Sequence, residues 1–294
     1  MARLTFAAAS LGVLLAGSGC VQIGASGPLR YMASEEKRFT TTGRPMVVLS
    51  TFDGPIDVRP WDRPEVLVVV EKYAITRSMT DDIEIRTDQN GDRVTVEARI
   101  KQPDPSQGLW TSGRSARLVV SVPASSDVQA RSGDGSIAVE HISGQFDLES
   151  GDGSIRGRDL TGNIRAHTGD GSIRLEGVNG AVDIDTRDGS IVANGTLTAL
   201  RARSGDGSVR VHADRGSAAK DDWDISTGDG SVIVELPDAF DAELDANTGD
   251  GRVSVHRSIM SDQQDQSRRK VRGRLGAGGN ALRVRSGDGS ITLR

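Results

Sequence analysis

The sequence predicts an all-β protein whose body is a parallel β-solenoid, with two strands in each coil of about 18 residues. Three observations predict this fold. The pattern [S/T]-[G/R]-D-G-[S/R]-[I/V] occurs eight times, and the first four intervals between copies are 18 residues each. Apolar and polar residues alternate on both sides of the pattern, as they do in strands with one buried face. The chain has 36 glycines but only 3% aromatic residues, which suits tight turns around a thin core.

The repeated motif marks one turn of each coil. Its aspartates are Asp134, Asp152, Asp170, Asp188, Asp206, Asp229, Asp250 and Asp288. A ninth, degenerate copy with the sequence STFDGPI surrounds Asp53. Fifteen of the 36 glycines lie in the eight motifs, where we expect tight turns with positive φ. The serine or threonine that opens each motif falls on the inward phase of its strand, as Ser150 and Thr168 do.

Each coil is expected to contain two short strands joined by two turns. Pairs such as Ile173 and Leu175 alternate after the motif, and pairs such as Val182 and Ile184 alternate before the next one. Coils stacked in register, about 4.8 Å apart, place like residues above one another, and eight of them would span about 38 Å. A meander of antiparallel hairpins would use the same D-G turns. The solenoid is favoured because a meander does not require identical residues in every second strand.

The chain is expected to divide into four segments. Residues 1–19 are a signal peptide, and residues 20–44 are a lipidated cysteine and a tether. Residues 45–130 form an irregular N-terminal β region that caps the solenoid. Residues 131–294 contain the solenoid repeats, with a polar insertion near 257–275.

The first twenty residues have the features of an export signal. Arg3 precedes an apolar run that is shorter than the roughly 20 residues needed to span a bilayer, and that fits a cleaved secretory signal. The only cysteine, Cys20, ends this segment, so no disulfide can form within the chain. The segment resembles a bacterial lipoprotein signal, which implies lipidation of Cys20, although Gly17 stands where that pattern usually has leucine. The alternative is an ordinary signal with an incidental cysteine.

The repeats also carry a family resemblance. SGDGSI in tandem, VVLSTFDGPIDV upstream and the final LRVRSGDGSITL resemble the bacterial "putative adhesin" domain over roughly residues 45–294. This resemblance implies a β-strand-repeat domain of unknown function in exported and envelope proteins, and it supplies no catalytic residues. By resemblance to Gram-negative lipoproteins, Val21 after the cysteine implies the outer membrane if the source is Gram-negative.

The eight motif aspartates are the candidate metal site. Stacking would place them along one edge, where neighbouring carboxylates repel by roughly 1 kcal/mol in water. The coil resembles the calcium-binding β-roll of repeats-in-toxin proteins, which implies a calcium column, although here aspartate occurs in only one of the two turns. The alternative is that each aspartate accepts backbone hydrogen bonds within its own turn. No other cofactor is predicted.

Composition and motifs exclude several functions. The formal net charge of -5 and the scarcity of aromatic residues disfavour nucleic-acid binding. No H-E-x-x-H motif, nucleophile elbow or P-loop is present. His212 and His256 share a phase but lie two coils apart, too far for one metal ion. A column six residues after each motif aspartate, which begins with Glu140 and Arg158, is interpreted as a solvated face with attraction between opposite charges.

The sequence therefore predicts a non-catalytic, lipid-anchored protein of the cell envelope with a structural or adhesive role. It would present a rigid polar surface to an envelope protein or a glycan. The first alternative is a calcium-responsive envelope β-roll. The second is a polysaccharide-acting β-helix enzyme, for which the outward residues Asp183, Asp185, Arg201 and Arg203 offer carboxylates and basic groups on adjacent coils.

Overall fold

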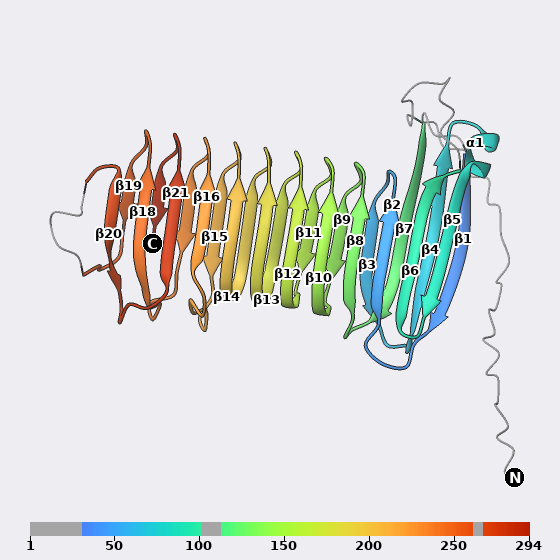
Figure 1. Ribbon diagram of the computed structural model, residues 1–294, viewed down its shortest axis with the longest axis horizontal. Coiled ribbons are helices and arrows are strands. Elements are labelled where there is room, and N and C mark those ends of the chain that lie inside the picture. The colour runs from blue at the N-terminus through green and yellow to red at the C-terminus, as the bar shows by residue number, and fades with distance from the viewer. Residues whose placement is uncertain (1–30, 102–112, 261–266) are drawn as a thin grey trace, which may run out of the picture.

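The computed structural model describes residues 31–101, 113–260 and 267–294, and these form 22 strands and one short helix. The molecule is an elongated stack of strands that lie across its long axis (Figure 1). No helix within the described ranges is long and apolar enough to cross a membrane. The prediction of an all-β fold is confirmed.

One group of strands lies at the N-terminal end of the stack. It consists of β1 (Tyr31–Thr40), β4 (Glu65–Ala74), β5 (Ile83–Asn90), β6 (Arg93–Ile100) and β7 (Arg114–Pro123), with helix α1 (Arg77–Asp81) between β4 and β5.

The other strands, apart from β20, flank the D-G turns. They are β2 (Met46–Thr51), β3 (Ile56–Trp61), β8 (Asp127–Ser132), β9 (Ile137–Glu140), β10 (Ser143–Ser150), β11 (Ile155–Arg158), β12 (Thr161–Thr168), β13 (Ile173–Thr186), β14 (Ile191–Ser204), β15 (Val209–Ala213), β16 (Trp223–Thr227), β17 (Val232–Glu235), β18 (Ala242–Thr248), β19 (Val253–Val255), β20 (Lys270–Leu275), β21 (Ala281–Ser286) and β22 (Ile291–Leu293).

Two parallel ladders run along the stack, one on each side of the core. Ladder A joins β6, β2, β8, β10, β12, β13, β14, β16, β21 and β18, in that order. Ladder B joins β7, β3, β9, β11, β13, β14, β15, β17, β22 and β19. Regular coils pair with an offset of one repeat, so that Phe146 lies opposite Ile164. The parallel pairing excludes a meander of hairpins between these coils.

Antiparallel pairs close both ends of the stack. β1 pairs with β4, β4 with β7, and β5 with β6 at the N-terminal end. β20 pairs with β18 at the other end. The prediction of a parallel solenoid is therefore confirmed in part, since parallel coils occupy the body and antiparallel strands the ends.

The coils do not follow sequence order near the C-terminus. β21 pairs with β16 on one side and with β18 on the other, and β22 lies in the same way between β17 and β19. The last coil of the chain is thus inserted between two coils that precede it. The expected succession of Asp229, Asp250 and Asp288 is wrong, because the strand pairing places Asp288 between the other two.

Three predicted segment boundaries differ from the structure. Residues 31–40, assigned to the tether, form β1, which pairs with β4. This strand lacks a buried apolar face because it lies at an edge, so its sequence shows no alternation. The degenerate copy around Asp53 forms a full coil from β2 and β3, so the parallel ladders begin before residue 131. The expected insertion near 257–275 contains β20, which pairs with β18.

Close approach, and not positive φ, explains the motif glycines. Of the glycines around the D-G turns, only Gly54 of the degenerate copy has positive φ, at 125°. A Cβ atom on Gly171 would lie 2.2 Å from the carbonyl oxygen of Gly153, and one on Gly153 would lie 2.2 Å from that of Gly135. Neighbouring turns therefore stack as closely as the strands that they join, and side chains beyond hydrogen do not fit there.

Candidate functional site

The inward hydroxyl of each motif holds the D-G turn. Thr186 Oγ1 accepts a hydrogen bond from the Gly189 N–H (3.2 Å) and donates to the Gly171 carbonyl oxygen of the neighbouring coil (2.9 Å). Both bonds recur at Ser132, Ser150, Ser204, Thr227, Thr248 and Ser286. These side chains are buried, as predicted from their phase. Each hydroxyl thus links its own turn to the turn of the next coil.

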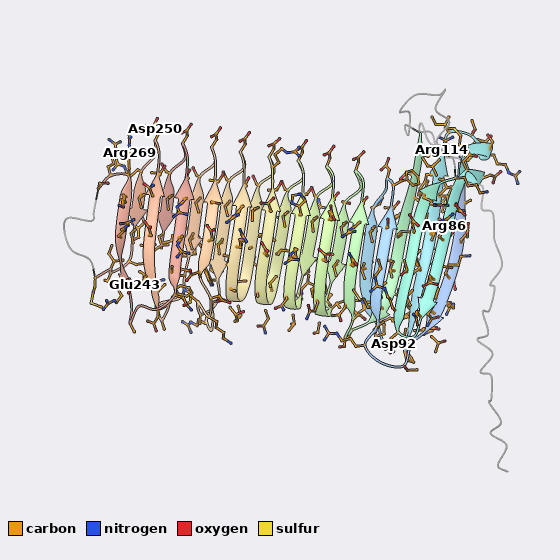
Figure 2. All side chains as sticks on the ribbon, in the orientation of Figure 1. Arg86, Asp92, Arg114, Glu243, Asp250 and Arg269 are labelled. Carbon is orange, nitrogen blue, oxygen red and sulfur yellow. The ribbon has the colours of Figure 1, made fainter. Side chains whose placement is uncertain are left out.

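The motif aspartates occupy the exposed tips of the turns, along one edge of the stack. Figure 2 shows Asp250 at this edge beside Arg269, and their side chains form an ion pair of 3.2 Å. Arg187, which replaces the first glycine of its motif, pairs with Asp170 at 3.4 Å. Burial and the charge of Asp134 raise the pKa of Asp53. Within the described part of the chain, no backbone N–H donates to any of the eight motif carboxylates. The inward hydroxyls accept the turn N–H groups that the aspartates were expected to accept.

Calcium binding by this edge stays a prediction. The described residues contain no group of three or more histidine, cysteine, aspartate or glutamate side chains arranged to hold a metal ion. Cations would therefore have to bridge the carboxylates of neighbouring coils. If they do, millimolar calcium should raise the melting temperature, and an unchanged melting temperature would contradict the calcium hypothesis.

Outward side chains of ladder A alternate in charge from coil to coil. We call this set the central column; in spatial order it contains Asp147, Arg165, Asp183, Arg201, Asp224, Arg283, Asp245 and Arg272. Arg165 lies 3.8 Å from Asp183, and Arg272 lies 3.2 Å from Asp245. The alternation is complete only because β21 places Arg283 between two aspartates. Opposite charges on adjacent strands therefore agree with the inserted order of the last coil.

Ladder B carries a similar column, which confirms the attraction between opposite charges expected there. Arg158 lies 3.6 Å from Glu140, and Arg59 lies 3.9 Å from the same carboxylate. Near the C-terminus, Glu235 pairs with Arg294 and with His212. Hydrogen bonds from Arg294 and then from His212 lower the pKa of Glu235.

A groove with a volume of about 710 Å³ crosses the outer face of ladder A, from Met46 in β2 to Asp222 beside β16. Its polar lining consists of the central column from Asp147 to Arg201, together with Asp127, Gln129, Gln145, Asn163 and Asp222. The small side chains of Ala181 and Ala199 lie on β13 and β14, toward the Asp222 end of the groove. The groove therefore runs across the strands and presents polar groups from the five consecutive strands β8, β10, β12, β13 and β14, with Met46 of β2 at one end and Asp222 at the other.

The groove is built from paired groups at its two ends. Gln145 N–H donates to Asp127 Oδ1 (2.7 Å), and Arg44 forms an ion pair with the same carboxylate. At the other end Asp222 accepts from the Ala281 N–H (2.9 Å) and from Arg283 (2.8 Å). These bonds, in that order, lower the pKa of Asp222.

The residues proposed from the sequence are only partly brought together. Cys20 lies outside the described residues. Asp183 and Arg201 both line the groove. Asp185 and Arg203 lie in the next column, where Asp185 pairs with His167 (3.1 Å), and Arg203 reaches back to Asp224 of the central column (2.7 Å). Among the four histidines, His141 pairs with Asp159 and His212 with Glu235. His141, His167 and His212 thus contact carboxylates at three separate places.

The groove and the central column were not predicted from the sequence. A signal for the column was present, because seven of its members lie five residues before a motif aspartate, as Asp147 does before Asp152. The small residues Ala181 and Ala199 at another repeated position were the signal for the groove. Whether small residues form a groove depends on the side chains that flank them on neighbouring strands, and those neighbours are known only when the stacking order is known.

Comparison with known proteins gives the family and several similar structures. The family model described as "Toastrack DUF4097" matches residues 61–294. No curated protein matches the chain significantly. A "putative adhesin" from Bacteroides fragilis shows 8% identity and a TM-score of 0.36, with 89% of this chain and 97% of the other covered.

Two further crystal structures are similar over most of both chains. A "putative cell adhesion protein" from Clostridium sporogenes has 12% identity and a TM-score of 0.29, with 88% and 97% covered. A "putative lipid binding protein" from Parabacteroides distasonis has 10% identity and a TM-score of 0.37, with 89% and 96% covered.

Proposed function

Since the chain belongs to the Toastrack DUF4097 family, we propose that it is a non-catalytic protein of the cell envelope. Its role is structural or adhesive, and it binds an envelope protein or a glycan on the outer face of ladder A. The single observation that carries this proposal is the groove from Met46 to Asp222.

Rigidity supports a presenting role. Two ladders hold each coil on both of its neighbours, and the buried hydroxyls add bonds between the turns. Ion pairs between neighbouring coils, such as Arg165–Asp183, Arg158–Glu140 and Arg272–Asp245, add further links along the outer faces. A groove on such a stack keeps its shape when it is empty, and a preformed site loses little conformational entropy on binding.

The geometry of the groove supports binding and not glycoside hydrolysis. Cleavage of a glycosidic bond uses two carboxyl groups, one of which has a raised pKa and donates a proton. Asp222 has a lowered pKa, held by Ala281 and Arg283, which is opposite to the requirement for a general acid. Asp183 lies between Arg165 and Arg201 in the column and 3.8 Å from Arg165, so it is one member of a row of paired charges and not half of a carboxyl pair.

The proposed anchor is a lipid on Cys20. Ten residues separate this cysteine from Tyr31, the first residue of β1, and the eleven steps from one to the other reach at most about 40 Å. A membrane anchor would thus hold the N-terminal end of the stack toward the lipid and leave the inserted C-terminal coil at the distant end (Figure 1). Mass spectrometry of the mature N-terminus tests this part, and an unmodified Cys20 would contradict it.

The binding role is tested with cells that display the full chain. Adherence is measured to surfaces coated with purified envelope polysaccharide or with envelope protein. The variant Ala181→Trp/Ala199→Trp fills the groove, and Ala138→Trp places the same side chain on the outer face of ladder B. We expect adherence at least tenfold lower for the first variant and unchanged for the second. Equal adherence of the first variant and the wild type would overturn the proposed site.

A further inference from the structure

We propose that the groove takes an extended glycan chain that is uncharged or carries amino groups, lies across the strands and places about one sugar on each coil. This inference rests on the proposed function and names the ligand class for the same groove.

The lining of the groove is periodic. The five strands from β8 to β14 contribute residues from the same two register positions, so that Gln145 and Asp147 on β10 are followed by Asn163 and Arg165 on β12. The positions repeat at the strand spacing of about 4.8 Å, which gives the groove a length of about 29 Å over seven strands. A ligand that uses this lining must itself repeat at a similar distance.

A glycan fits this repeat better than a peptide does. A pyranose ring with its linking oxygen advances a chain by a distance comparable to the strand spacing, whereas an extended peptide advances about 3.3 Å per residue and falls out of register. The backbone groups of the groove floor are already paired within ladder A, as between Ile164 and Val182. They are not available for strand addition, which is the usual way to bind an extended peptide on a sheet.

The charge of the lining selects among glycans. Four aspartates line the groove together with Arg165 and Arg201, and the aspartates at its two ends pair with Arg44 and Arg283, so its charges balance. Such a groove has no excess of cations to attract acidic polysaccharides or nucleic acids, and it accommodates neutral or amino-bearing chains. Carboxylate, amide and guanidinium groups all hydrogen-bond to hydroxyl groups, which a glycan supplies at every sugar.

The groove also predicts how affinity depends on length. Phe146 is the aromatic residue of the lining, and only 3% of it is exposed, so ring stacking does not contribute to binding. Binding would depend on hydrogen bonds, each of which adds modest free energy. Affinity should therefore be weak for a disaccharide and should increase with each further coil that is engaged.

The test is calorimetric titration of the purified full chain with three oligosaccharide series of two to eight sugars: cello-oligosaccharides, chitosan oligosaccharides and oligogalacturonates. We expect affinity for the neutral or amino series to rise at least tenfold from two to six sugars and then level off. The acidic series should bind at least tenfold more weakly. Ala181→Trp/Ala199→Trp should abolish binding, and Ala138→Trp should leave it unchanged.

The outcomes separate this inference from the proposed function. Failure of all three series to bind, affinity independent of length, or preference for the acidic series would overturn the glycan inference. If Ala181→Trp/Ala199→Trp still abolishes adherence to envelope protein, the groove remains the binding site and its ligand is a protein. If that variant neither loses adherence nor loses oligosaccharide binding, both proposals fail.

Discussion

The hydroxyl group of Thr186 makes bonds in two coils at once. It accepts from Gly189 in its own turn and donates to Gly171 in the preceding turn, and the side chain is 2% exposed. Loss of this group leaves a buried N–H and a buried carbonyl without that partner, and unsatisfied buried groups destabilise the folded state. The contribution of one hydroxyl to stability is therefore larger than that of an exposed hydroxyl on the same surface.

Replacement of Thr186 by valine keeps the shape of the side chain and removes both bonds. We expect Thr186→Val to lower the free energy of unfolding by about 1–3 kcal/mol. Thr161→Val is the matched control, because Thr161 is exposed at the start of β12. Chemical denaturation of both variants measures the difference. Equal stabilities would show that the hydroxyl bonds do not hold the turns.

The inward phase of these serines and threonines could be predicted from alternation alone. Their bonding role could not, because the carbonyl acceptor belongs to a turn about 15 residues away in the sequence. The motif aspartate is the more conspicuous residue and suggested a turn-capping role. The structure places the aspartate at the solvent-exposed tip instead, and the turn N–H donates to the inward serine or threonine hydroxyl, as Gly189 does to Thr186.

At the scale of the strand, alternating charge selects which strands become neighbours. β21 lies between β16 and β18, and its Arg283 faces Asp224 on one side and Asp245 on the other. Stacking in sequence order would place these two aspartates side by side, and like charges directly opposite are destabilising. Hydrophobic alternation is the same in all coils and does not distinguish between the two orders.

Reversal of one charge in β21 tests this role. Arg283→Asp would set three carboxylates in a row and remove the ion pair with Asp222. Arg285→Asp is the control on the same strand, because its cross-strand neighbours are Ser226 and Asn247, which are uncharged. We expect Arg283→Asp to lower the melting temperature by several degrees more than Arg285→Asp, as for a loss of about 1–2 kcal/mol. Equal effects would contradict the charge argument.

Acid should loosen the inserted coil. The pKa of Asp222 and that of Glu235 are lowered in the folded state, and both groups hold the last coil through Ala281, Arg283 and Arg294. A lowered folded pKa stabilises the protein above the unfolded value, here 3.8 or 4.5, and this stability is lost as the pH falls through the folded value. Below pH 4 the coil should therefore open more often.

Hydrogen exchange of residues 281–294 measures this opening. After correction for intrinsic rates, protection should be lower at pH 3 than at pH 6, and the difference should be larger than for β10. The double variant Asp222→Asn/Glu235→Gln removes both titrating groups, so its protection should change little between the two pH values. A pH dependence equal to that of the wild type would assign the effect to other residues.

For the whole molecule, the period of 18 residues predicted the coil and its two strands correctly. The ends could not be predicted in the same way. β1 is an edge strand with the sequence YMASEEKRFT, and its half-exposed side chains give no apolar alternation. The position of the inserted coil could not be predicted from the period either. The long interval before Asp288 suggests a loop between coils that stack in chain order. One end of the groove depends on the inserted coil, since Asp222 is held there by β21.

The inserted coil should make the stability of the stack depend on its last fourteen residues. Removal of 281–294 would expose β16 and β17 on one side and β18 and β19 on the other, because β21 and β22 pair with all four. The two exposed coils could close only by placing Asp224 beside Asp245. We therefore expect the truncated chain to lose far more stability than one terminal coil would contribute, with a lower and broader melting transition.

Two additions to the truncated chain distinguish insertion from a simple loss of length. A peptide of residues 281–294 supplied in trans should raise the melting temperature, because the vacated position matches it on both sides. Asp245→Arg with Arg272→Asp restores alternating charge between β16 and β18 without the last coil. This double variant should recover part of the lost stability in the truncated chain and destabilise the full chain, where it sets Arg283 beside another arginine. The opposite pattern in the two backgrounds would contradict the role assigned to charge in ordering the coils.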